Sequence, residues 1–152
     1  MKIRSMIFAA ALAGTPALLV APAAHAEPPI YTGVFSNTAL QGHDPVAYFT
    51  EGKPVKGDDA FTADYRGATF KFSSLANRDA FIENPEAYAP QYGGYCAWAM
   101  ADGKHAKGDA RYWKIVDGKL YLNYNKGIQA KWDADIPGFI ARADAAWADI
   151  ND

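Results

Sequence analysis

Two stretches of this 152-residue chain align with one another without gaps at an offset of 51 residues. The loop Gly-Lys-x-x-Lys-Gly-Asp stands at residues 52–58 and again at 103–109, and each copy precedes a turn that contains glycine, Gly67 and Gly118. Repetition at a fixed offset indicates that one supersecondary unit is used twice. The alternative is two similar hairpins that arose independently.

The first copy has the pattern of a β-hairpin followed by a helix. Residues 61–65 and 68–72 flank Arg66-Gly67, and the alternation of Phe70 and Phe72 with polar residues predicts one buried face. Ser73-Ser74 then offers caps for a helix that Asn84-Pro85 ends.

The second copy predicts the same elements. Residues 113–116 and 119–122 flank Asp117-Gly118, a strong hairpin signal, and a helix containing Ile128 and Trp132 follows. Apolar residues from 139 to 150 fall on one side of a last helix. We therefore predict an α+β fold: a small single domain of β-hairpins packed with short helices, with an internal pseudo-duplication and a C-terminal helix.

The N-terminus has the three parts of a secretory signal. Residues 1–26 contain no acid, carry Lys2 and Arg4 at the start, continue with an apolar run over 6–20 and end on Ala24-His25-Ala26. We predict cleavage after Ala26, a periplasmic or secreted protein, and no stable membrane anchor after cleavage. The alternative is an uncleaved anchor, although the run is shorter than the ~20 residues that span a bilayer.

Removal of the signal leaves 126 residues, enough for one domain. Residues 27–38 are predicted to be an extended, exposed lead-in, and 39–152 the domain itself. The mature chain has 13 basic and 17 acidic residues, a net charge of −4. Nucleic acid and anionic membranes require a basic face, so we expect neither as a partner. The sequence leaves the oligomeric state open.

The chain has a single cysteine, Cys96, which aligns with Pro45 at the offset of 51. One cysteine cannot form an internal disulfide, and a free thiol is unusual in an oxidising compartment. Cys96 is therefore the candidate catalytic residue, as a reactive thiol. The alternatives are a buried, structural cysteine and a Cys96–Cys96 disulfide between two chains.

Cys96 also leads a set of soft metal donors. Met100 follows it by four residues, which places thiol and thioether on one face of a helix and suits copper(I). His43 and His105 are further candidate ligands, so the predicted metal set is Cys96, Met100, His43 and His105, for copper or zinc. The alternative roles are a core position for Met100, a solvated loop residue for His105 and a turn residue for His43.

The segment 44–88 resembles the YHS domain, a small module usually regarded as metal-binding. The resemblance rests on Asp44-Pro45-Val46 and on the series Tyr65-Arg-Gly-x-x-Phe-x-Phe-Ser-Ser-x-x-Asn77, continued by Phe81, Pro85 and Tyr88. The extension 89–152, with Gln91-Tyr-Gly-Gly-Tyr-Cys96, is similar to a branch of exported YHS-domain proteins, some of which are called selenoproteins.

The chain departs from the resembled family at the metal ligands. Cysteines of the metal-binding form would fall at Ala47, Ser73 and Asn77. A methyl, a hydroxyl and an amide do not replace thiolates for soft metals, so we expect the usual YHS metal pocket to be absent. Ser73 and Asn77 are instead predicted to form hydrogen bonds at the start of the helix.

Two functions follow from these residues. The first is an exported YHS-domain protein that binds a soft metal ion or exchanges electrons with a redox partner through Cys96. The second is a non-catalytic module that binds a small ligand or a protein, in which Cys96 is structural.

Overall fold

The computed structural model describes residues 26–151. The predicted signal, apart from its last residue, lies outside this range. Within it, no helix combines the length and the apolar character needed to cross a membrane.

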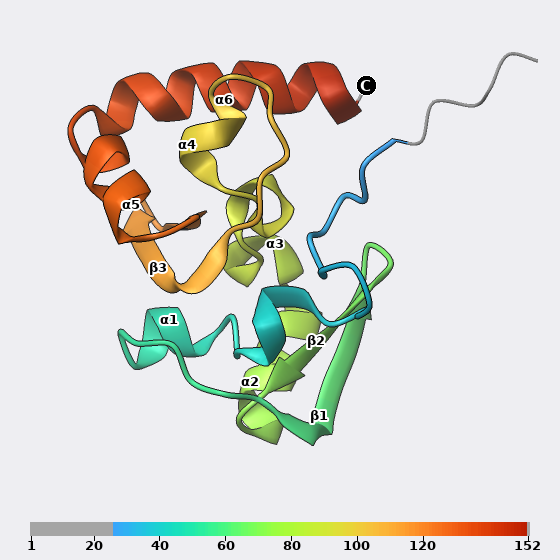
Figure 1. Cartoon of the computed structure of the whole chain (residues 1–152). Helices are drawn as coiled ribbons and strands as arrows, with labels where there is room; N and C mark the ends of the chain where they lie inside the picture. The colour runs from blue at the N-terminus through green and yellow to red at the C-terminus, as the bar shows by residue number, and fades with distance from the viewer. Residues whose placement is uncertain (1–25, 152) are drawn as a thin grey trace, which may run out of the picture.

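The described residues form short helices and two antiparallel hairpins (Figure 1). In chain order the elements are η1 (Ala39–Gly42), α1 (Ala47–Thr50), β1 (Asp58–Tyr65), β2 (Ala68–Phe72), α2 (Leu75–Glu83), α3 (Pro85–Tyr88), η2 (Gln91–Gly94), α4 (Ala97–Met100), β3 (Asp109–Val116), β4 (Lys119–Asn123), α5 (Lys126–Asp133) and α6 (Ile136–Asn151). The predicted α+β class, both hairpins and the C-terminal helix are confirmed. Residues 44–49, for which the repeat predicts no element, form a turn and most of α1.

The two hairpins share one register, displaced by 51 residues. Asp58 pairs with Phe72 and Tyr65 with Ala68, while Asp109 pairs with Asn123 and Val116 with Lys119. Each hairpin has a register shift after its first pair, at the same place. The internal pseudo-duplication is therefore present in the architecture. We call residues 39–88 the first unit and 91–133 the second unit.

At the start of the units, equivalent residues are separated by 52 positions instead of 51. Three consecutive residues have positive φ in both, Leu40 to Gly42 and Tyr92 to Gly94. The Asp44 amide then donates to Val55 (2.8 Å) and the Cys96 amide to Ala106 (2.9 Å). Cys96 thus corresponds to Asp44, and the alignment with Pro45 was wrong, because the second unit has one residue fewer before its hairpin.

Strand β4 separates two hydrophobic clusters. Leu120 and Leu122 belong to the cluster that contains the phenylalanines of the first unit. Tyr121, between them, belongs to the second cluster with Trp132 and Met100. Alternate side chains of a strand point to opposite faces, so β4 supplies both cores. Helix α6 contacts α4 over the second cluster (Figure 1).

The middle of the predicted lead-in is not exposed, although residues 27–29 before it are. Ile30 is 3% exposed and lies in the first cluster. The Tyr31 amide donates to the Gly93 carbonyl (2.9 Å), and the Tyr95 hydroxyl donates to Pro28 (3.0 Å). A Cβ on Gly93 would overlap the Pro29 carbonyl. The segment around Pro29 and Ile30 can therefore pack here only because residue 93 is a glycine. Residues 27–29 and the later part, which includes Val34 and Phe35, match the predicted exposure.

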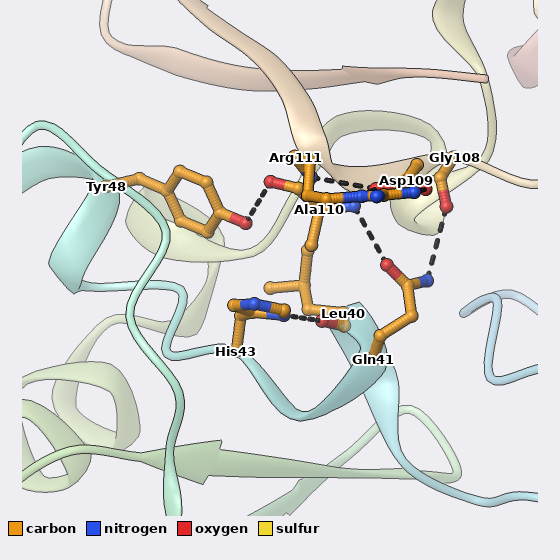
Figure 2. A network of polar contacts seen from close by, with 8 residues as sticks. All are labelled: Leu40, Gln41, His43, Tyr48, Gly108, Asp109, Ala110 and Arg111. Atoms are coloured by element: carbon orange, nitrogen blue, oxygen red, sulfur yellow. Dashed lines mark hydrogen bonds and ion pairs between the residues drawn. The ribbon is translucent and has the colours of Figure 1, made fainter. Parts of the chain in front are cut away.

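A polar network joins the two units (Figure 2). The side-chain amide of Gln41 accepts a hydrogen bond from the Ala110 backbone amide (2.8 Å) and donates one to the Gly108 carbonyl (3.2 Å). It thus pairs with this segment as the backbone of a neighbouring strand would. The Tyr48 hydroxyl donates to the Ala110 carbonyl (2.7 Å). The start of the first unit is therefore fixed against the irregular beginning of β3.

Candidate functional site

The carboxylate of Asp44 organises the interior of the first unit. Asp44 is fully buried, and its Oδ1 accepts from the backbone amides of Val46 (2.8 Å) and Ala47 (3.3 Å). Its Oδ2 accepts from the Ser73 amide (2.9 Å), the Ser73 hydroxyl (2.7 Å) and Asn77 Nδ2 (2.7 Å). Five donors therefore compensate the buried charge, whose transfer from water would otherwise cost much free energy.

This arrangement does not suit the metal that the family resemblance implies. Ala47 offers no donor atom, and Ser73 and Asn77 point their hydrogens at Asp44. The two carboxylate oxygens are already engaged, and a soft metal would have no thiolate to replace them. Ser73 and Asn77 do form hydrogen bonds near the start of α2, but Ser74 is the residue that caps it, through the Asn77 amide (3.1 Å).

Cys96 is buried inside the second unit, with 1% of its surface exposed. Its thiol donates to Asn123 Oδ1 at 3.7 Å. Burial raises the pKa of the Cys96 thiol, and the backbone amides of Ala99, Tyr124 and Trp98 act in the opposite direction. The raised pKa means that the sulfur is mainly a thiol at neutral pH, which is the weakly nucleophilic form.

The structure brings Met100 near Cys96, one helical turn away. The Met100 amide donates to the Cys96 carbonyl (3.0 Å), and the Met100 side chain is fully buried in the second cluster. The predicted core position is therefore the one Met100 occupies. Whether this pair also binds copper or zinc stays a prediction.

The two histidines have other neighbours. His43 lies at the junction of the units, where its Nδ1 is 2.9 Å from the Leu40 carbonyl (Figure 2). Burial lowers the pKa of the His43 imidazole below its ordinary value. His105 lies edge-on to Tyr95, with the ring centres 4.8 Å apart. Among residues 26–151, no group of three or more His, Cys, Asp or Glu side chains is placed to hold a metal ion.

A cleft of about 290 Å³ opens beside the second unit. Two cationic side chains line it, Arg66 from the β1–β2 turn and Lys119 from the start of β4. Glu86 is the acid at its wall. Tyr65 and Trp147 supply aromatic surface, so the cleft combines positive charge with apolar faces.

Sequence reasoning missed three features of this region. The sequence singles out Asp44 only as part of the Asp44-Pro45-Val46 match, because its partners are 29 and 33 residues away. Asn123 reads as an ordinary residue after a strand, although it is fully buried. The cleft combines residues from separate parts of the chain, and no local pattern joins them. The internal repeat could have pointed to Asp44, because an offset of 52 instead of 51 aligns Asp44 with Cys96.

A family model of the YHS domain matches residues 46–92, about a third of the chain. This span runs from the turn after Asp44 to the start of η2, and includes Ser73 and Asn77. No curated protein and no solved structure matches the chain.

Asp44→Ala should destabilise the protein by about 3–5 kcal/mol, because it leaves the Ser73 hydroxyl, the Asn77 amide and three backbone amides without their acceptor. Urea unfolding followed by fluorescence measures the change. The control is Asp64→Ala at an exposed carboxylate that accepts from Thr69, where the cost should stay below about 1 kcal/mol. Equal effects of the two substitutions would contradict a central role for Asp44.

Cys96 should react with an aromatic disulfide reagent at least about 100-fold more slowly in the native protein than in denaturant, since only the exposed thiolate attacks. The absorbance of the released thiolate measures the rate. A Ser36→Cys, Cys96→Ser variant, with its thiol at an exposed position, should react rapidly in both conditions. Rapid native labelling of Cys96 would instead favour a reactive thiol.

Proposed function

The chain is a YHS domain-containing protein, and on that premise we propose that it is an exported, non-catalytic module that binds a small organic anion in the cleft beside its second unit. The positions of the family's usual metal ligands belong here to the structural hydrogen-bond network around Asp44. The cleft between Arg66 and Lys119 is the observation that carries this proposal.

The charges at the cleft favour an anionic ligand. Arg66 and Lys119 carry two positive charges against the single negative charge of Glu86. A guanidinium pairs with a carboxylate or sulfonate through two parallel hydrogen bonds, while an ammonium acts as a point charge. The protein as a whole is acidic, so this local excess is not a consequence of composition.

The walls of the cleft favour a ligand with an apolar part. Tyr65 and Trp147 present rings, and Ile30, Ala89 and Pro90 add aliphatic surface. Ligand sites commonly combine apolar walls with a few polar groups that fix orientation. The volume of about 290 Å³ limits the ligand to a small molecule.

The function centred on Cys96 has weaker support. Exchange of electrons with a protein partner needs a thiol that the partner can reach, and Cys96 is 1% exposed. A metal site of four ligands needs the histidines beside the sulfur, and no such cluster forms among the described residues. Both points favour the binding module in which Cys96 is structural.

Anilinonaphthalene sulfonate, an aromatic anion, should bind with saturable fluorescence and one equivalent per chain. Arg66→Ala and Lys119→Ala should each weaken binding about two- to fivefold, the effect of losing one partly exposed charge contact. Lys53→Ala and Lys104→Ala, at exposed lysines of the repeated loops, are matched controls and should leave the affinity unchanged.

Two results would overturn the proposal. Identical affinities for all four variants would place the dye elsewhere on the protein. Copper or zinc bound near one equivalent in the purified protein, and lost in Cys96→Ser, would establish the metal function instead.

Export is the second part of the proposal, and it rests on the N-terminal sequence. In a bacterial host, the protein from the periplasmic fraction should begin at Glu27 when its N-terminus is sequenced. Ala24→Asp, which removes a small residue that signal peptidase requires, should block the cut. Recovery of the uncleaved native chain in the membrane fraction would favour an anchor.

A further inference from the structure

The equivalence of Cys96 and Asp44 extends to the groups around them. Asp44 accepts from the backbone amides of Val46, Ala47 and Ser73. The backbone amides that act on the Cys96 sulfur are those of Trp98, Ala99 and Tyr124. These three follow the first three by 52, 52 and 51 residues, so each has its counterpart in the first unit. The same main-chain surroundings hold a carboxylate in one unit and a thiol in the other.

The second unit also holds a side-chain donor without an acceptor. Asn123 is fully buried, and its amide lies against the thiol, with Oδ1 3.7 Å from Sγ and 3.2 Å from the Trp98 amide. Its Nδ2 has no hydrogen-bond partner. In the first unit an asparagine at another position, Asn77, donates its Nδ2 to Asp44. A buried donor left unsatisfied is costly, so this one points to an acceptor that the thiol does not provide.

An oxygen atom on the sulfur would supply that acceptor. A cysteine sulfinate carries one negative charge on two oxygens and has nearly the shape of an aspartate carboxylate. Placed at Cys96, it would meet the backbone amides that are equivalent to those around Asp44, next to the buried Asn123 side chain whose Nδ2 has no acceptor.

We propose that Cys96 is a site of oxidation by hydrogen peroxide or a similar small peroxide, and that the second unit retains the product as a sulfinate. In the first step the sulfur attacks one peroxide oxygen, the O–O bond breaks and water leaves, which gives the sulfenic acid. A second peroxide adds the second oxygen, and another water leaves. The sulfur is oxidised, both peroxides are reduced, and the sulfinic acid loses its proton to form the anion.

Burial of Cys96 sets the conditions for this reaction. A small peroxide reaches a buried sulfur only during local opening, so oxidation should be slow. Burial also keeps large thiols away from the sulfenic acid, which would otherwise condense with them to a disulfide. The inference does not depend on the ligand of the cleft.

The first test is peroxide treatment of the native protein followed by mass spectrometry of its peptides. We expect addition of two oxygens at Cys96 and an unfolding midpoint no lower than that of the untreated protein. The Cys96→Ser variant, treated alike, reports any oxidation of Met100 separately. A product that stops at Met100, or unfolding of the protein as Cys96 gains oxygen, would overturn the proposal.

The second test replaces the sulfinate by its carboxylate analogue. Cys96→Asp should fold and should have a urea midpoint at neutral pH no lower than that of Cys96→Ala. Its midpoint should fall with acidification, when the carboxylate is protonated. If Cys96 occupies an ordinary apolar position, Cys96→Ala will be the more stable variant by far. The peroxide test on the unmodified chain stands even if Cys96→Asp fails to fold.

Discussion

The buried carboxylate of Asp44 connects three segments of the first unit that are distant in sequence. It holds the turn before α1 through two backbone amides, the end of β2 through Ser73, and α2 through Asn77. An unpaired charge in this position would be strongly destabilising, so all three segments must be in place for any of them to be stable. Because the turn directly follows η1, Asp44 indirectly fixes Gln41 against β3 and so against the second unit (Figure 2).

The second unit reaches the same architecture with different interior chemistry. Phe72 and Phe81 pack in the first unit at 5.1 Å between ring centres, and Asn123 and Trp132 occupy the equivalent positions in the second. Both replacements add a buried N–H group, and neither Asn123 Nδ2 nor Trp132 Nε1 has a partner within the described residues. The hairpin register tolerates this change because it depends on the backbone and on the turn residues, which are alike in both copies.

Local residue patterns made the hairpins predictable from the sequence, whereas the long-range contacts left no pattern that could be recognised. Gly67 and Gly118 adopt positive φ at turns that the sequence identifies by residue type, and Ser74 and Asn125 cap helices within three residues of their partners. Asp44 finds its partners about 30 residues away, and Ile30 is buried because a glycine 63 positions later leaves space for the neighbouring carbonyl. Such contacts depend on how the elements pack, which periodicity does not encode.

A carboxylate and a thiol make different demands on the same main-chain donors. The Asp44 carboxylate accepts hydrogen bonds from five donors, so these contacts hold the first unit together once it folds. Cys96 is neutral while its pKa is raised by burial, and Asn123, which accepts from its thiol, keeps a buried Nδ2 without an acceptor. Any chemistry that places a negative charge on this sulfur would bring the second unit to the state that the first already has. The stability of the second unit should therefore depend on the redox environment, whereas that of the first should not.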